Sequence, residues 1–156
     1  MPRRSAGLLV YRRREGGLEV LLVHPGGPLW ARRDEGAWQI PKGEYAEGED
    51  PLAAARREFQ EETGTAMTGE FMALAPIRQP GGKRVQAWAV EGDLDAAAIR
   101  SNTFTLEWPR GSGQQREFPE VDRAGWFAPA EARRKLLPSQ QPLLDELLAR
   151  LNDGPG

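Results

Sequence analysis

Short apolar runs alternate with glycine- and proline-rich segments along most of the chain. Residues 6–11 and 18–23 are two such runs, and the charged, glycine-containing tip between them predicts a β-hairpin. The other strand candidates are apolar runs bounded by turn residues: 70–77, 85–90, 103–108 and 126–127. These runs predict a β-sheet at the centre of the fold.

The clearest helix is predicted at residues 51–63. Asp50 is a favourable N-cap, Pro51 suits the first helical position, and Gly64 suits the left-handed residue that ends many helices. Three apolar side chains share one face of this helix at helical spacing: Leu52, Ala55 and Phe59. We therefore expect that face to pack on the sheet.

The remaining segments complete one domain. Two further helices are expected at 130–136 and 142–151. Polar or glycine-rich loops are expected at 24–36, which we interpret as a functional loop, and at 42–48 and 111–115. The length of 156 residues, with 39% apolar residues, fits a single domain, which we place at 1–151, before a flexible tail at 152–156.

Composition excludes several kinds of chemistry. The chain has no cysteine and one histidine, His24, so disulfides, thiolate zinc sites and a cysteine nucleophile are excluded, and a serine triad is disfavoured. The formal net charge is −2, which does not favour binding to nucleic acid or to an anionic membrane. No apolar run approaches the length of a membrane span, so we expect a cytoplasmic protein. Carboxylates remain the main catalytic groups.

Three carboxylates fall on one face of the predicted helix. Glu58, Glu61 and Glu62 stand at positions i, i+3 and i+4, where like charges cost about 0.2 to 0.5 kcal/mol per pair. A hard divalent cation such as Mg²⁺ or Mn²⁺ would relieve this repulsion, because such ions prefer oxygen ligands. The alternative is a solvated acidic helix face with no ligand.

The segment from Gly43 to Thr65 resembles the Nudix box. That pattern is G, five residues, E, seven residues, then R-E-U-x-E-E-x-G-U, where U is an apolar residue. The matching residues are Gly43, Glu49, Arg57, Glu58, Phe59, Glu61, Glu62 and Gly64. Thr65 departs from the final apolar position, which concerns packing after the helix and not the metal ligands. The resemblance covers 23 residues closely and identifies the chain as a Nudix-type protein.

The resemblance implies a fold, a cofactor and a reaction. The fold is an α/β/α sandwich with a mixed central sheet, and the reaction is hydrolysis of a nucleoside diphosphate linked to another group, with Mg²⁺ or Mn²⁺. The implied metal ligands are the Gly43 carbonyl, Glu58, Glu61, Glu62 and Glu120. Glu58 or Glu120 is the implied base, and Glu117 is the competitor of Glu120. Arg57 is counted with Glu58 and Glu120 among the catalytic residues, since it can pair with Glu49 or Glu61 and hold the carboxylates.

Two residues before the box are candidates for substrate binding. Lys42 can contact phosphate, and Trp38 can stack on a base; the alternatives are a solvated loop lysine and a tryptophan in the core. His24 could approach the substrate and Lys83 could bind phosphate, but the alternatives are favoured for both residues. A structural or exposed histidine is favoured for His24, and a role in keeping a hairpin tip soluble is favoured for Lys83.

The substrate stays open at this point. The Trp-x-x-Pro-Lys-Gly segment at 38–43 is similar to the diadenosine-polyphosphate and diphosphoinositol branches, whereas Pro80, 15 residues after Thr65, is typical of ADP-ribose hydrolases. We expect a small nucleotide or pyrophosphate-containing partner, with neither a membrane nor a nucleic acid. A homodimer is left open, and a Nudix-like domain that binds nucleotides without hydrolysing them is the alternative function.

Overall fold

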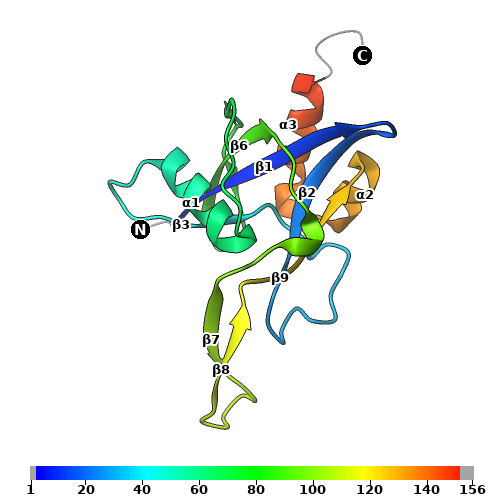
Figure 1. Ribbon diagram of the computed structural model, residues 1–156. Helices are drawn as coiled ribbons and strands as arrows, with labels where there is room; N and C mark the ends of the chain where they lie inside the picture. Colours follow the sequence, from blue (N-terminus) through cyan, green and yellow to red (C-terminus); the bar gives the residue numbers. More distant parts are fainter. Residues whose placement is uncertain (1–2, 152–156) are drawn as a thin grey trace.

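A seven-stranded mixed sheet forms the centre of the computed structural model, which describes residues 3–151 (Figure 1). Its main path runs through five strands in the order β4 (Met72–Ala73), β6 (Arg84–Glu91), β1 (Arg4–Arg14), β2 (Gly17–Pro25) and β9 (Val121–Phe127). Two short strands extend it: β3 (Lys42–Glu44) pairs with β1, and β5 (Ile77–Arg78) pairs with β6. β1 and β6 are parallel and the other pairs are antiparallel, so the predicted mixed sheet is confirmed.

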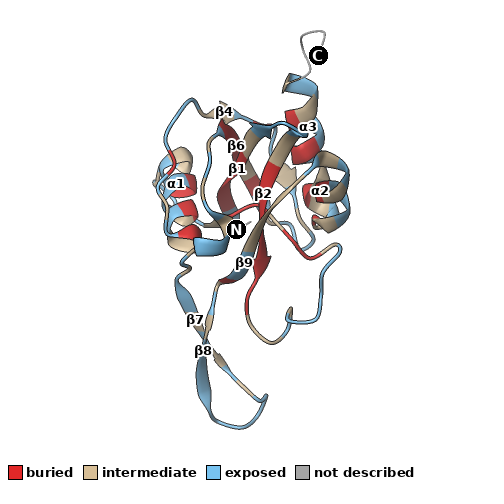
Figure 2. Cartoon of the chain, turned by 45° about the vertical axis from the view of Figure 1, so that its right-hand side comes forward, coloured by how far each residue is buried: buried red, intermediate tan, exposed pale blue. Residues whose placement is uncertain are grey.

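Helices cover both faces of this sheet. Ala6, Leu8 and Val10 of β1 pack with Phe59 of α1 (Pro51–Thr63) on one face. Leu9 belongs to the opposite apolar layer, together with buried residues of α2 (Pro129–Lys135) and α3 (Gln141–Leu151). In Figure 2 α1 lies on one side of the sheet and α2 and α3 lie on the other. Two short 3₁₀ helices, η1 (Ala96–Ala98) and η2 (Pro138–Gln140), complete the chain. The result is the expected α/β/α sandwich.

Both ends of α1 are formed as the sequence predicts. The Asp50 carboxylate accepts a hydrogen bond from the backbone N–H of Ala53 at 2.9 Å, which caps the first turn. At the other end Gly64 has a φ of +80°, and its N–H donates to the Gln60 carbonyl at 2.8 Å. The predicted apolar face is also confirmed, since Ala55 and Phe59 are fully buried. These contacts fix α1, and therefore its glutamates, relative to the sheet.

A two-stranded antiparallel ribbon projects away from the sheet (Figures 1 and 2). It consists of β7 (Thr103–Glu107), which the sequence predicts, and β8 (Gln115–Pro119), which it does not. Most side chains of β8 are exposed, so the strand lacks the apolar alternation that a half-buried strand shows. The expected loop at 111–115 is the turn of this ribbon together with the first residue of β8.

Three other sequence predictions need correction. The expected strand at 70–77 is interrupted: only β4 and β5 are extended, and Pro76 between them has no N–H to donate to a neighbouring strand. The expected loop at 42–48 begins with β3. β9 begins at Val121, ahead of the predicted strand at 126–127, which was placed too late because the first half of β9 is polar and lacks an apolar run. The predicted tail at 152–156 lies outside the described residues. No helix within residues 3–151 is long and apolar enough to cross a membrane.

Candidate active site

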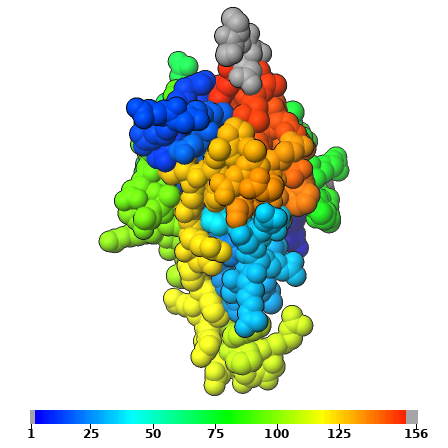
Figure 3. Space-filling model, turned by 90° about the vertical axis from the view of Figure 1, so that its right-hand side faces the viewer, coloured from blue at the N-terminus to red at the C-terminus, as the bar shows by residue number. Residues whose placement is uncertain are grey.

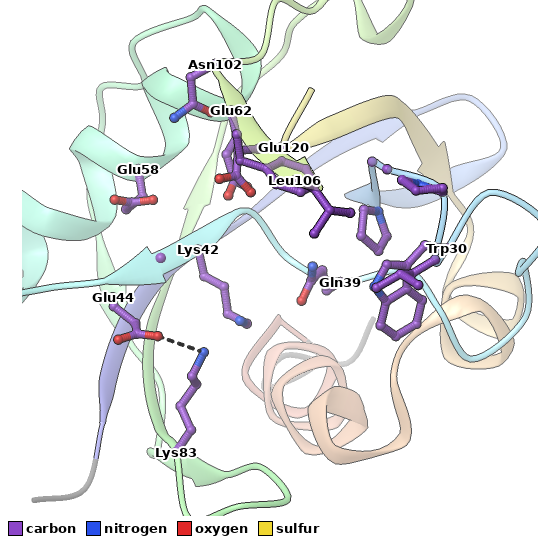
Figure 4. A pocket seen from close by; sticks show the side chains of 17 residues that line it. Trp30, Gln39, Lys42, Glu44, Glu58, Glu62, Lys83, Asn102, Leu106 and Glu120 are labelled. Atoms are coloured by element: carbon purple, nitrogen blue, oxygen red, sulfur yellow. Dashed lines mark ion pairs between the residues drawn. The ribbon is translucent and has the colours of Figure 1, made fainter. Parts of the chain in front are cut away.

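A cavity of about 460 Å³ lies where β3, α1, the segment after β2 and the base of the ribbon meet (Figure 4). This volume lies in the range of small-molecule sites. One part of the lining, here called the charged end, consists of Lys42, Glu44, Glu58, Glu62, Lys83 and Glu120. Another part, here called the apolar end, consists of Pro25, Pro28, Leu29, Trp30, Phe104 and Leu106. One cavity therefore presents two chemically different surfaces to a ligand.

Gly43 and Glu58 form the closest contact at the charged end. A Cβ atom placed on Gly43 would lie 1.8 Å from Oε1 of Glu58 and 2.1 Å from its Cδ. Only glycine therefore lets the β3 backbone approach this carboxylate. Burial raises the pKa of Glu58, and the negative charge of Glu61 raises it further. The glycine thus provides a cradle for a carboxylate that is costly to ionise without a cation.

Glu62 and Lys42 both line the charged end of the cavity. Burial raises the pKa of Glu62 to about 8, and the charge of Glu58 adds to this rise. Burial also lowers the pKa of Lys42 to about 8, with a contribution from the nearby charge of Lys83. Lys83 itself forms an ion pair with Glu44 at 3.5 Å (Figure 4). Two lysines therefore border the carboxylates, although only Lys42 was a candidate from the sequence.

Arg57 holds the glutamates of α1 from outside the cavity. Its Nε donates to Glu49 Oε2 at 3.1 Å, and its Nη1 donates to Glu58 Oε2 at 2.7 Å and to Glu61 Oε2 at 3.3 Å. Both pairings that the sequence suggests, with Glu49 and with Glu61, are present. Arg57 does not line the cavity, so its expected place among the catalytic residues is corrected to that of a positioning residue.

Glu120 enters the cavity from the junction of β8 and β9. Its backbone N–H donates to the Asn102 carbonyl at 2.8 Å, and its own carbonyl accepts from the N–H of Gly26 at 2.9 Å. Burial raises the pKa of the Glu120 carboxyl, followed by the charge of Glu61. Its competitor Glu117 is exposed on β8 and does not line the cavity. The structure therefore places Glu120, and not Glu117, at the cavity, on a backbone held by two hydrogen bonds.

The donor set fits a hard divalent cation. Within residues 3–151 no three acidic, histidine or cysteine side chains lie close enough together to form a metal site by themselves. Glu61 is hydrogen-bonded to Arg57 and does not line the cavity. Mg²⁺, however, usually keeps several waters and needs only one or two carboxylates together with substrate oxygens. Glu58 raises the pKa of Glu62, and Glu120 also contributes to that rise, so these carboxylates share one electrostatic site. Their mutual repulsion and the Gly43 cradle fit such an ion.

Trp38 does not lie where base stacking would need it. It is 5% exposed, its Nε1 donates to Asp34 Oδ1 at 2.8 Å, and its ring packs edge-on against His24 and Phe127. The expectation of a substrate contact is therefore corrected to a core role, because the short strand-like segment after the loop turns this ring inward. The aromatic rings at the cavity are those of Trp30 and Phe104.

His24 is a structural residue, as the sequence favoured. Its side chain is fully buried, with Nδ1 2.8 Å from Asp122 Oδ1 and Nε2 2.6 Å from the Arg33 carbonyl. These contacts tie the end of β2 to β9 and to the loop that follows β2. They hold the base of the segment that lines the apolar end.

Sequence reasoning missed most of the lining outside the box. The residues that it did not single out are Leu29, Trp30, Gln39, Asn102, Phe104 and Leu106, and it favoured a solubilising role for Lys83. The interpretation of 24–36 as a functional loop was the available signal, since residues 25–30 line the cavity. No spacing rule connects that loop with β7, because the two meet only through the fold.

The comparisons with known proteins identify the family. The model of the NUDIX domain family matches residues 1–150. The chain therefore belongs to the NUDIX family, as the box predicted, and the predicted enzyme class, a pyrophosphohydrolase, is confirmed with it. An RNA pyrophosphohydrolase of Rhodospirillum rubrum is 30% identical over 162 residues, covering 96% of this chain and 92% of that protein.

Solved structures share the fold. An Ap4A hydrolase of C. elegans, in a binary complex, has a TM-score of 0.66 and 22% identity, and the match covers 94% of this chain and 97% of that one. The NUDIX domain of Shewanella oneidensis NrtR, complexed with ADP ribose, has a TM-score of 0.68 and 16% identity, covering 97% and 90%. These similarities confirm the Nudix fold.

Proposed function

We propose that this protein hydrolyses a pyrophosphate bond in a nucleoside diphosphate linked to another group, and that it requires Mg²⁺, with Mn²⁺ as a substitute. One observation carries the proposal: Glu58, Glu62 and Glu120 face the same cavity as Lys42 and Lys83. Carboxylates for a cation and amines for phosphates are the two sets of groups that such a substrate needs. The substrate class spans nucleoside triphosphates, dinucleoside polyphosphates and ADP-ribose.

The proposed metal ligands are Glu58, Glu62, Glu120 and the carbonyl oxygen of Gly43, together with Glu61, which would have to turn from Arg57 toward the cavity to reach the ion. A bound Mg²⁺ neutralises phosphate charge and lowers the pKa of a coordinated water. Arg57 orients Glu58 and Glu61 through the hydrogen bonds described above. The chain thereby holds its carboxylates in place before the substrate arrives.

The lysines of the charged end are proposed to bind the substrate phosphates. Lys42 is half-buried and Lys83 lies beside it, so both ammonium groups can reach one polyphosphate without leaving the cavity wall. Lys83 exchanges its ion pair with Glu44 for a phosphate oxygen at little cost, because the pair is partly exposed. These cations orient the scissile bond against the carboxylates.

Glu58 or Glu120 is proposed to accept the proton of the attacking water. Both line the cavity, and burial raises the pKa of each, which brings a carboxylate closer to the range where it is an effective base. Glu58 is also held by Arg57, whereas the described residues give the Glu120 carboxylate no such ion pair. Glu120 is therefore the group with more freedom to follow the water.

A panel of hydrolysis assays, in which the phosphorylated products are separated by anion-exchange chromatography, tests the proposal. The substrates are nucleoside triphosphates, dinucleoside polyphosphates, ADP-ribose, dinucleotide cofactors and nucleotide sugars, each with Mg²⁺ and with Mn²⁺. A 5′-triphosphorylated RNA is added because the relative from R. rubrum is named an RNA pyrophosphohydrolase. We expect turnover of at least one nucleotide, and its loss when the metal is chelated.

The alternative is a NUDIX domain that binds a nucleotide and does not hydrolyse it. Absence of turnover across the panel, together with measurable nucleotide binding, would favour that alternative. The complete set of box glutamates speaks against it, since binding alone does not need them all. The cytoplasmic location and the homodimer that the sequence left open stay predictions.

A further inference from the structure

Asn102 links the two elements that carry the carboxylates of the charged end. It lies in the connection between η1 and β7. Its backbone N–H donates to the Glu61 carbonyl, near the end of α1, at 2.8 Å, and its own carbonyl accepts from the N–H of Glu120 at 2.8 Å. The main chain of one residue therefore connects α1 to the junction of β8 and β9.

The two residues before Asn102 strengthen this link. The N–H of Arg100 donates to the Thr63 carbonyl at 2.9 Å, so this segment satisfies carbonyls that the end of α1 leaves without helical partners. The Oγ of Ser101 accepts from the N–H of Val121 at 3.0 Å and donates to the Asn102 carbonyl at 2.8 Å. The backbone at Asn102 is therefore held from both sides by bonds that do not involve its side chain.

The base of the ribbon, where Asn102 precedes β7, is packed by the segment after β2. A Cβ on Gly26 would lie 1.9 Å from the Pro119 carbonyl oxygen, so only glycine lets this segment lie directly on the ribbon. Figure 3 shows the segment in light blue against the ribbon in yellow. The N–H of Gly26 also donates to the Glu120 carbonyl at 2.9 Å. These contacts fix the base of the ribbon before any ligand binds.

The side chain of Asn102 lines the cavity and has no structural task. Every hydrogen bond that Asn102 forms within residues 3–151 uses its main-chain atoms. In Figure 4 its carboxamide lies beside Glu62, whereas Lys42 and Lys83 lie on the other side of the carboxylates. A polar group that faces a cavity from a fixed backbone, without a protein partner, is preorganised to contact a ligand.

The charges around Asn102 define the contact that it can make. A phosphate brings more negative charge to an end of the cavity that already contains Glu58, Glu62 and Glu120. The two lysines supply donors from one side, and the carboxamide supplies two N–H donors from the other. A neutral donor contacts a phosphoryl oxygen without competing with a divalent cation for the carboxylates.

We propose that Asn102 is a further catalytic residue, whose carboxamide N–H donates to a phosphoryl oxygen at the scissile bond and stabilises the negative charge that develops there. This inference rests on the proposed function for the identity of the substrate. Lys42 and Asn102 then hold the phosphate from opposite sides of the carboxylates. The donor is in place before the reaction, because its backbone is bonded to α1 and to Glu120 and not to the substrate.

Two substitutions distinguish the donor of the carboxamide from its acceptor. Asn102→Ala removes both, whereas Asn102→Asp keeps the shape and one acceptor oxygen but replaces the N–H donor with a negative charge. We expect Asn102→Ala to lower kcat and kcat/KM by about 10²-fold, the cost of losing one preorganised donor. Asn102→Asp should lower both further, because its carboxylate repels the phosphate. Wild-type rates in Asn102→Asp would overturn the proposal and assign the side-chain oxygen to the cation.

Binding of a diphosphonate tests the contact without turnover. Isothermal titration with methylenediphosphonate and Mg²⁺ should show an affinity about tenfold lower in Asn102→Ala than in the wild type, the size of one hydrogen bond to a charged group. Asn102→Asp should bind more weakly still. Gln115→Ala is the matched control, since it removes an exposed carboxamide of the ribbon that does not line the cavity. It should keep the wild-type affinity and rate.

Thermal melts of the metal-free variants should lie close to that of the wild type, because the bonds at position 102 are made by the main chain. No diphosphonate binding by the wild type, or wild-type affinity and rate in folded Asn102→Ala, would overturn the proposal. Diphosphonate binding that depends on Asn102 in a protein without turnover would instead contradict only the proposed hydrolysis.

Discussion

A Cβ atom added to Gly43 would lie 1.8 Å from Oε1 of Glu58, so the Glu58 carboxylate on α1 occupies its place only because residue 43 on β3 is a glycine. The two residues are 15 positions apart in the sequence and meet because β3 pairs with β1, on which α1 packs. The first glycine of the box therefore has a steric role that is independent of any metal.

Gly43→Ala should displace the Glu58 carboxylate and lower kcat/KM by about 10²-fold, the cost of a misplacement of about 1 Å in a catalytic group. The backbone at Gly43 has no positive φ, so the loss comes from the clash and not from strain. Steady-state kinetics and a thermal melt measure the effect. Gly16→Ala is the matched control, because a Cβ there meets nothing within 4 Å. Equal activity of the two variants would contradict the steric role.

Glu62→Gln should remove most hydrolysis and most of the Mg²⁺-induced rise in Tm, because it removes a negatively charged ligand and keeps the shape. Without metal at pH 8.5 the variant should be more stable than the wild type, since a buried carboxylate that is costly to ionise has been replaced by a neutral amide. Differential scanning calorimetry with and without Mg²⁺ tests both statements. Full activity at saturating Mg²⁺ would exclude Glu62 as a ligand. The same activity result is expected for Glu61→Gln.

The metal-free protein should lose stability as the pH rises from about 5 to 8. In this range the Glu62 carboxyl, whose pKa is about 8 in the fold, keeps its proton when folded and loses it when unfolded. The folded state therefore binds more protons, and the free energy of unfolding falls by at most about 1.4 kcal/mol per pH unit for one group.

The comparison with Glu62→Gln isolates this effect, because that variant should show a flatter pH dependence. Lys42 acts in the opposite sense at higher pH: its pKa is lowered to about 8, so stability rises as the pH increases from about 8 toward 10.5. Denaturant titrations at several pH values measure the free energy of unfolding across both pH ranges. Saturating Mg²⁺ should reduce the pH dependence of stability between about 5 and 8, since the ion takes the place of the proton on Glu62.

Glu120→Gln should lower kcat by roughly 10² to 10⁴, the range for loss of a general base, and should retain more of the Mg²⁺-induced rise in Tm than Glu62→Gln does, because the carboxylates of α1 remain. Its backbone is fixed by Asn102 and Gly26, so the substitution changes the carboxyl group alone. Glu117→Gln, on the exposed face of the ribbon, is the control and should be fully active. Normal turnover in Glu120→Gln would confine the catalytic carboxylates to the box.

The sequence predicted the parts of the molecule in which local chemistry decides the structure. The cap at Asp50, the stop at Gly64 and the stripe that includes Phe59 are local signals, and α1 follows them. The spacing of the box glutamates is local in the same sense. These signals are sufficient to predict that the carboxylates of α1 share one face of the helix.

The apolar end could not be predicted in this way. Trp30 and Phe104 are 74 positions apart, and they meet only because the segment after β2 lies on the ribbon. β8 was missed because both of its faces are exposed, so it has no alternating pattern. Trp38 was misplaced for a related reason: nothing in a short extended segment reveals which face of the sheet its side chain will cover.

The most direct test of the central claim is the rate of product formation, measured by anion-exchange chromatography, for wild type and Glu58→Gln, each with Mg²⁺ and with EDTA, on the best substrate of the panel. Glu58 joins the helix, the Gly43 cradle and the cavity, so its amide variant removes one charge from the proposed centre. We predict turnover by the wild type with Mg²⁺ and loss of at least about 10² of that rate in EDTA or in Glu58→Gln. The same rate in all four reactions would contradict a metal-dependent hydrolase built on α1.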